Sequence, residues 1–134
     1  MGNINSINNV NFEDIQHAIT NTNKYVIITT ISGNGHTSFI QGTIPIETEE
    51  HVINSMLNSG KYKDINIIVY GLNCNDISIY NKVKQLKSLG INKVFVYVGG
   101  IFEWLLLQDI YGTSHFPTTC VEKDLLKYKP IKIF

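Results

Sequence analysis

Three continuous apolar runs, each rich in β-branched residues, are the most strongly hydrophobic parts of the chain. They cover residues 24–30, 65–70 and 93–98. A strand in a parallel sheet is covered on both faces, so it is apolar almost throughout instead of alternating. We therefore expect these runs to be the central strands of a mostly parallel sheet.

Between the runs, apolar residues recur at the three- and four-residue spacing of a helix. A first helix is expected over residues 11–22, with Phe12, Ile15 and Ile19 on one face. Asn11 is its predicted N-cap, and Asp14 follows at the position of a capping box. Further helices are expected over residues 47–58 and 77–89, and from the Gly99-Gly100 turn to about Tyr111.

The second and third helices have end signals as well as an apolar face. Gly60 and Gly90 are expected to stop them, and Asp76 is expected to cap the start of the third. The positions predicted to face the sheet are Val52, Ile53, Met56 and Leu57 in the second helix, and Ile79, Val83 and Leu86 in the third.

Strands that alternate with helices predict a three-layer α/β/α fold around a central, mostly parallel sheet. Two shorter strands are expected over residues 42–46, where Pro45 favours an edge or a strand end, and 131–134. A chain of 134 residues is the size of one domain. Its core should cover about residues 11–112, followed by a C-terminal extension over 113–134.

Composition narrows the function classes. The chain has 11 lysines, no arginine and 11 acidic residues, so its formal net charge is zero. This balance argues against nucleic-acid binding. Without arginine there is no bidentate guanidinium clamp for phosphate or carboxylate groups. The single alanine and the many Ile and Asn residues are typical of an AT-rich genome.

The sequence predicts a cytoplasmic protein. Cys74 and Cys120 are the only cysteines, and no hydrophobic leader precedes the first helix, so both are expected to be reduced thiols. The apolar stretch within residues 101–111 is too short to span a bilayer.

The first residues also fit the N-myristoylation pattern, with Gly2 as acceptor and Ser6 at the required position. The alternative is a chance match to a common Met-Gly start. No lysine precedes Lys24 to reinforce a lipid anchor, and a single myristoyl chain binds membranes only marginally. Membrane association is therefore expected only if Gly2 is acylated.

Residues 65–104 contain a strand ending in Val69-Tyr70, a six-residue loop, a helix that ends in Leu89-Gly90 and leads to Val94, and a Gly-Gly turn separated from Trp104 by three residues. This order of elements and motifs resembles the second half of a rhodanese-like domain. Residues 11–60 fit the element order of the family loosely. The long helix before Phe116-Pro117 is similar to that of a eukaryotic or large-virus variant of the family.

The resemblance implies a sulfurtransferase fold whose usual chemistry is missing. The family's nucleophile directly follows the Val-Tyr position, which here is Gly71. The family's Asp-x-Arg at the end of the first strand is absent from residues 25–31, and no arginine can close the loop. Related phosphatases and arsenate reductases need such an arginine. We therefore expect a catalytically silent module that binds a protein partner or has a structural role.

The alternative function is a sulfurtransferase or persulfide carrier with Cys74 as a displaced nucleophile. Residues 71–76 connect a strand to a helix N-terminus, where an open α/β sheet normally holds its ligand and where backbone amides favour an anion. Asp76 opposes this function, because its own negative charge disfavours a second anion. Cys74 could equally be an inert thiol. Cys120 is either its resolving partner or, by the simpler interpretation, a passive cysteine.

The loop after the first strand is expected to open on the same sheet edge. His36 in that loop could join Cys74 and Glu103 in a cluster that activates the thiol. The alternative is a surface histidine. The candidate ligand pocket thus contains Gly71, Leu72, Asn73, Asn75, Asp76, His36 and Glu103.

No metal or cofactor site is expected. His17 and His51 are predicted on solvated helix faces and His115 in a loop, without the spacing of a zinc site. The pair Gly33 and Gly35 lacks the third glycine of a dinucleotide fingerprint, and Trp104 is interpreted as core.

Overall fold

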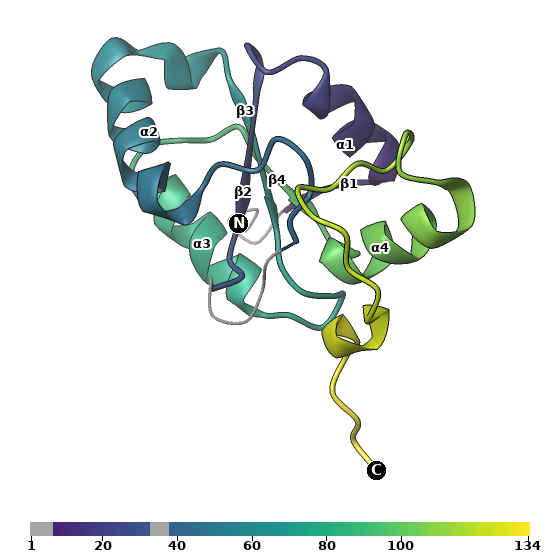
Figure 1. Ribbon diagram of the computed structural model, residues 1–134. Helices are drawn as coiled ribbons and strands as arrows, with labels where there is room; N and C mark the ends of the chain where they lie inside the picture. The colour runs from purple at the N-terminus through teal and green to yellow at the C-terminus, as the bar shows by residue number, and fades with distance from the viewer. Residues whose placement is uncertain (1–6, 33–37) are drawn as a thin grey trace.

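A four-stranded parallel sheet forms the centre of the molecule, as a computed structural model of residues 7–32 and 38–134 shows. In chain order its strands are β1 (Asn8–Val10), β2 (Tyr25–Thr29), β3 (Asn66–Tyr70) and β4 (Val94–Tyr97), and in space they follow the order β1-β4-β3-β2. Every pairing is parallel. The three apolar runs form β2, β3 and β4, which confirms the predicted α/β class (Figure 1).

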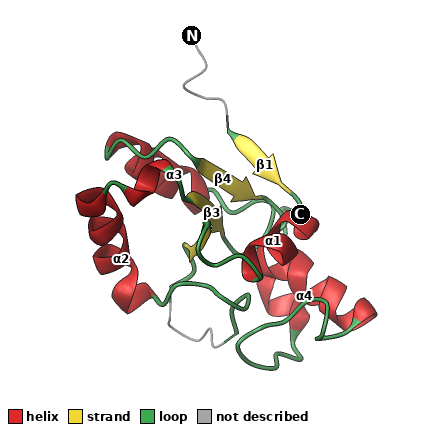
Figure 2. Ribbon diagram, turned by 90° about the horizontal axis from the view of Figure 1, so that it is seen from above, coloured by secondary structure: helices red, strands yellow, loops and turns green. Residues whose placement is uncertain are grey.

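Helices cover both faces of the sheet (Figure 2). On one face lie α1 (Phe12–Ile19) and α4 (Gly100–Tyr111), and on the other α2 (Ile46–Ser59) and α3 (Ser78–Ser88). A 3-10 turn, η2 (Lys61–Lys63), follows α2. A second, η3 (Leu125–Tyr128), precedes the C-terminal segment. No helix in the described part of the chain is long and apolar enough to cross a membrane.

The two layers of core are separated by the alternation of side chains along the strands. Ile27 and Ile68 pack with α1 and α4, whereas Ile28, Ile67 and Val69 pack with α2 and α3. Trp104 is the largest fully buried side chain of the first layer, followed by Tyr70, Tyr97 and Tyr128. This two-sided burial is why β2 and β3 have no polar face in the sequence.

The first strand is not predicted by the sequence analysis. Of its three residues only Val10 is apolar, and Asn8 and Asn9 are exposed. It forms because the free edge of β4 accepts it, with Asn8 opposite Phe95 and Val10 opposite Tyr97. A short edge strand of this kind has no hydrophobic pattern of its own.

Two predicted strands are wrong. Over residues 42–46 only one bridge forms, between Thr43 and Ile27, because Pro45 has no N–H to continue a ladder and α2 starts at Ile46. Residues 131–134 form no strand and are exposed, because they pair with no strand of the sheet.

The predicted helices agree with the structure to about one residue at their ends, except at the end of the first. Asn11 accepts from the amides of Glu13 and Asp14, and the Asp14 carboxylate accepts from the Asn11 amide, so the capping box is confirmed. The helix ends at Ile19 instead of 22. Gly60 stops α2 in a left-handed conformation, as predicted. The predicted inward positions are buried at Ile15, Ile53, Met56, Ile79, Val83 and Leu86, and half-buried at Phe12, Ile19, Val52 and Leu57.

Candidate functional site

The predicted site loop, residues 71–76, leaves the carboxyl end of β3 and is tied to the start of α4. The amides of Ile101 and Phe102 donate to the carbonyl oxygens of Gly71 and Leu72, each over 3.0 Å. These are among the first amides of α4, which have no partner within their own helix. The loop carbonyls thus satisfy donors that could otherwise hold an anion.

Gly100 makes this contact possible. Its φ of +67° is in the left-handed region, and a β-carbon there would lie 2.5 Å from the Gly71 oxygen and 2.9 Å from the Asn73 nitrogen. A side chain at this position would therefore push the two backbones apart. The second glycine of the Gly-Gly turn is required by close packing as well as by backbone conformation.

Asp76 closes the loop from inside. Its Oδ2 accepts a hydrogen bond from the Leu72 amide over 2.8 Å, and its Oδ1 accepts from the Ser78 amide over 3.0 Å. The Ser78 hydroxyl lies 2.6 Å from the same Oδ1 and 2.7 Å from the Thr30 hydroxyl. A β-carbon built at Gly71 would overlap the Asp76 carboxylate and come within 3.1 Å of Ile79. The carboxylate therefore fills the space beside residue 71.

The prediction for Asp76 needs a correction. The residue before α3 is Ile77, which makes no side-chain cap, and Asp76 reaches both forward to Ser78 and back to Leu72. Partial burial alone would raise the pKa of Asp76, but the hydrogen bonds from Leu72 and Ser78 outweigh it and lower the pKa below its ordinary value. The side chain is thus an anion held by the loop.

The C-terminal segment covers the loop from the other side. The Asn73 side chain, 7% exposed, donates to the Tyr128 carbonyl over 2.8 Å and accepts from the Asn75 amide over 2.9 Å. Tyr128 itself is fully buried in the layer that α1 and α4 form. In Figure 1 the yellow η3 turn lies directly against the loop that follows β3.

Neither cysteine is enclosed by the loop. Cys74 and Cys120 are free thiols and both are exposed. The contact of the Cys74 sulfur is with its neighbour, since Sγ lies 3.8 Å from Asn75 Oδ1. Nothing in the described part of the chain bonds the two cysteines to each other.

Glu103 is half-buried at the start of α4 and accepts from the Tyr97 hydroxyl, 2.7 Å from Oε1. Burial first, and then this hydrogen bond, raise the pKa of Tyr97 above its ordinary value. The carboxylate is thus engaged with Tyr97 and not with Cys74. His36 and Gly2, the other two predicted positions, lie outside the described residues.

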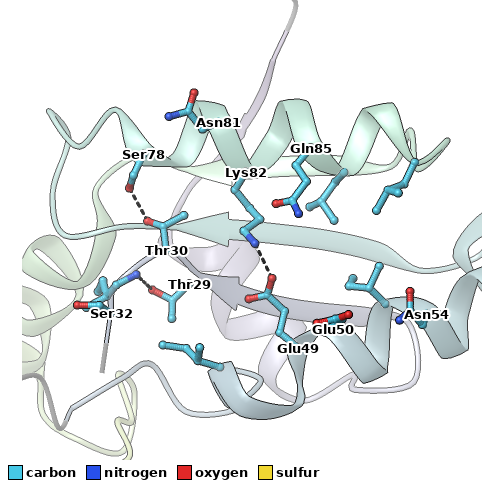
Figure 3. A pocket seen from close by; sticks show the side chains of 15 residues that line it. Thr29, Thr30, Ser32, Glu49, Glu50, Asn54, Ser78, Asn81, Lys82 and Gln85 are labelled. Atoms are coloured by element: carbon cyan, nitrogen blue, oxygen red, sulfur yellow. Dashed lines mark hydrogen bonds and ion pairs between the residues drawn. The ribbon is translucent and has the colours of Figure 1, made fainter. Parts of the chain in front are cut away.

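A cleft that the sequence analysis missed lies between α2 and α3, beside the end of β2. Its volume is about 780 Å³, within the range typical of ligand sites. Figure 3 shows Glu49 and Lys82 pointing toward one another across it, with the Lys82 Nζ 2.6 Å from Glu49 Oε2. Polar side chains line much of the rest: Thr29, Thr30, Ser32, Glu50, Asn54, Ser78, Asn81 and Gln85.

The cleft carries a small negative charge and has apolar edges. Two carboxylates, Glu49 and Glu50, stand against the one ammonium of Lys82. Ile46 and Leu89, which also line it, are 42% and 47% exposed. No three His, Cys, Asp or Glu side chains gather as a metal site anywhere within residues 7–32 and 38–134.

Sequence comparison gives little support for an activity. No protein-family model matches the chain. Over 62 residues the chain is 34% identical to an uncharacterized protein of Buchnera aphidicola. The match covers 46% of this chain and 37% of the Buchnera protein, so it spans less than half of either protein.

Solved structures share the fold. A yeast protein tyrosine phosphatase of the rhodanese family, Ygr203w, superposes with a TM-score of 0.60 at 13% identity, over 89% of this chain and 96% of that one. The Alr3790 protein of Anabaena gives 0.57 at 20% identity, over 88% and 97%. The As-Sb reductase of Leishmania major gives 0.53 at 15% identity, over 78% and 79%. The chain therefore has a rhodanese-like fold.

Proposed function

We propose that the chain uses its rhodanese-like fold for binding and does not transfer sulfur. The observation that carries the proposal is the position of Asp76, whose carboxylate occupies the space beside Gly71 and accepts the Leu72 amide. The loop thus contains its own anion. An anionic donor such as thiosulfate would meet a like charge where it needs hydrogen-bond donors.

Two further features support the proposal that the loop does not transfer sulfur. The family resemblance assigns the nucleophile to position 71, where glycine has no side chain. The first amides of α4, at Ile101 and Phe102, are bonded to the loop carbonyls. A loop without a thiolate at its centre lacks the nucleophile of the usual reaction, and the amides of Leu72, Ile101 and Phe102 are already bonded within the chain.

The activities named for two structural neighbours, a tyrosine phosphatase and an As-Sb reductase, belong to those proteins. Both names imply an oxyanion in the active site. This chain contains no arginine to clamp one, and its loop carries the Asp76 carboxylate. We therefore expect the chain to have neither phosphatase nor reductase activity.

The exposed thiol of Cys74 favours a second candidate function, a persulfide carrier. An accessible thiol can accept sulfur from a donor protein without an enclosed pocket. Cys74 lies three positions beyond residue 71, however, and a displacement of about 1 Å at a reacting centre can already cost about a hundredfold in rate. Any transfer by this route should be slow.

A thiosulfate:cyanide sulfurtransferase assay tests the proposal. In that reaction a thiolate takes the outer sulfur of thiosulfate and releases sulfite, and the resulting persulfide gives the sulfur to cyanide as thiocyanate. We would compare the wild type, Cys74→Ser, Asp76→Ser, and the double variant Gly71→Cys with Asp76→Ser. The second substitution is needed because a side chain at 71 overlaps Asp76.

We expect no turnover above background in the wild type, Cys74→Ser or Asp76→Ser, and measurable turnover in the double variant. Robust wild-type turnover that disappears in Cys74→Ser would overturn the proposal and establish Cys74 as the nucleophile. Turnover in Asp76→Ser alone would show that the loop had kept a nucleophile which Asp76 only blocks.

A further inference from the structure

We propose that the cleft between α2 and α3 binds residues 129–134 of a second copy of this chain. The inference names a ligand for the binding role proposed above. It does not depend on whether the loop after β3 transfers sulfur, because the cleft and the loop are different surfaces.

The cleft fits a cationic, apolar peptide segment. Its two carboxylates and one ammonium leave one negative charge in excess, at the exposed Glu50. Buried Ile53 and Leu86 form part of the lining, and the half-exposed Ile46 and Leu89 add apolar surface. The amides of Asn54, Asn81 and Gln85 can both donate to and accept from a peptide backbone.

Residues 129–134 have the complementary chemistry. The segment Lys-Pro-Ile-Lys-Ile-Phe contains two lysines and no acidic residue. Ile131, Ile133 and Phe134 are 90%, 85% and 99% exposed, more than any other large hydrophobic side chain in the described part of the chain. Exposed apolar side chains gathered in one segment indicate an interaction site.

The segment is long enough to follow the whole cleft. Six extended residues span at most about 20 Å, whereas α2 lines the cleft over residues 46–54 and α3 over residues 78–86, each about 12 Å. In an extended segment Ile131 and Ile133 share one side and Lys132 faces the other. The isoleucines can thus meet the apolar lining while Lys132 extends to the rim, where Glu50 is exposed.

The segment leaves the molecule in a direction that favours a neighbouring copy. Tyr128 is fully buried in the layer of α1 and α4, on the opposite face of the sheet from the cleft. Lys129 is extended, at φ −66° and ψ 158°, as the following Pro130 requires. In Figure 1 the segment points straight away from the body. To enter its own cleft it would have to turn back around the end of the sheet.

A contact between two different surfaces, segment and cleft, is heterologous. Each copy offers one of each, so the association either closes into a ring or continues as a chain. Its strength depends on the burial of three apolar side chains and on one or two rim charges. We expect it to be reversible and to weaken with salt.

Sedimentation velocity over a series of protein concentrations tests the proposal. The full chain should show a mass that rises with concentration, and removal of residues 130–134 should weaken association by about a hundredfold or more. Lys132→Glu or Glu50→Lys alone should weaken it by about two- to fivefold, and the two together should restore it. Lys123→Glu and Glu47→Lys, which lie outside the segment and the cleft, are the matched controls.

A synthetic peptide of residues 129–134, titrated into the shortened chain, separates the remaining outcomes. Binding that Glu50→Lys weakens and Glu47→Lys does not would support the proposal. A full chain that stays monomeric while the peptide still binds would show docking within one copy and overturn the assignment to a second copy. Absence of both association and peptide binding would overturn the proposal entirely. The sulfurtransferase assay is unaffected by either result, so the two proposals fail independently.

Discussion

Two regions next to α3, the loop before it and the cleft along it, differ in how many of their polar groups are hydrogen-bonded within the chain. In the loop 71–76, backbone and side-chain groups bond to the start of α4, to the Asp76 carboxylate and to the Tyr128 carbonyl. Along the side of α3, the cleft with α2 is open, and one ion pair, Glu49–Lys82, crosses it. The Ser78 hydroxyl belongs to both regions, since it lies beside Asp76 and lines the cleft.

The difference shows why a shared fold does not transfer a function. The loop is where related proteins are expected to do chemistry, yet here Asp76 fills the space beside Gly71 and accepts the Leu72 amide. The open volume is next to the loop, between α2 and α3. Function has to be argued from the groups that are free to act.

The largest effect should come from breaking the contact between the loop and α4. Gly100→Ala adds a β-carbon 2.5 Å from the Gly71 oxygen at a positive φ. We expect it to lower the free energy of unfolding by about 3 kcal/mol, from backbone strain and overlap together. Urea denaturation measures it.

Gly60→Ala is the control for strain alone, because Gly60 has a similar φ of +77° and open space around its Cβ position. It should cost about 1 kcal/mol. Equal losses at the two glycines would mean that the close approach of the backbones is not required.

Removing the internal anion should have the next largest effect. Asp76→Ala takes the acceptor from the Leu72 and Ser78 amides, and we expect a loss of about 1–2 kcal/mol in unfolding free energy at neutral pH. Asp64→Ala, at an exposed carboxylate, is the control and should change stability by less than about 0.5 kcal/mol.

The loss at Asp76 should depend on pH in a defined direction. Its folded-state pKa lies below the ordinary value, so its stabilisation is fully present above the unfolded-state pKa of about 3.9 and is lost as the pH falls through the folded-state value. The difference between wild type and Asp76→Ala should therefore be constant near neutrality and shrink in acid. A difference that grows in acid would contradict the assigned hydrogen bonds.

The cleft should contribute less to stability than the loop. A double-mutant cycle with Glu49→Gln and Lys82→Met should give a coupling energy of about 1 kcal/mol, because the two side chains are still 17% and 20% exposed. High salt should reduce it. A coupling as large as the loss in Gly100→Ala would mean that the cleft is a structural core instead of a surface open to ligands.

The smallest effect is expected at Cys74, which we place outside the closed part of the loop. Cys74→Ser should change the free energy of unfolding by less than about 0.5 kcal/mol. Titration with a thiol reagent in native buffer should modify both Cys74 and Cys120 rapidly. A thiol at 74 that reacts only after denaturation would place the side chain inside the loop.

Much of the fold could be predicted because its central strands are buried on both faces. Residues 25–29, 66–70 and 94–97 therefore stand out as apolar runs. The strand at Asn8–Val10 could not be found, since an edge with one apolar residue in three has no pattern. The expected strand at 131–134 fails for the opposite reason: its apolar residues are real, but no free sheet edge takes them.

The site was predictable only as a position along the chain. The sequence shows that a loop with Gly71 and Asp76 follows a buried strand. It does not show that the carboxylate turns back to the Leu72 amide, because that depends on the loop's conformation. The cleft was missed because Glu49 and Lys82 are 33 residues apart and each looks like an ordinary solvated helix position.

The central claim, a loop closed by its own carboxylate, is tested most directly by the intact mass of the wild-type chain after incubation with thiosulfate and removal of the excess. The account predicts an unchanged mass for the wild type, and the gain of one sulfur atom in the double variant Gly71→Cys with Asp76→Ser. A stable gain of one sulfur atom in the wild type that disappears in Cys74→Ser would contradict it.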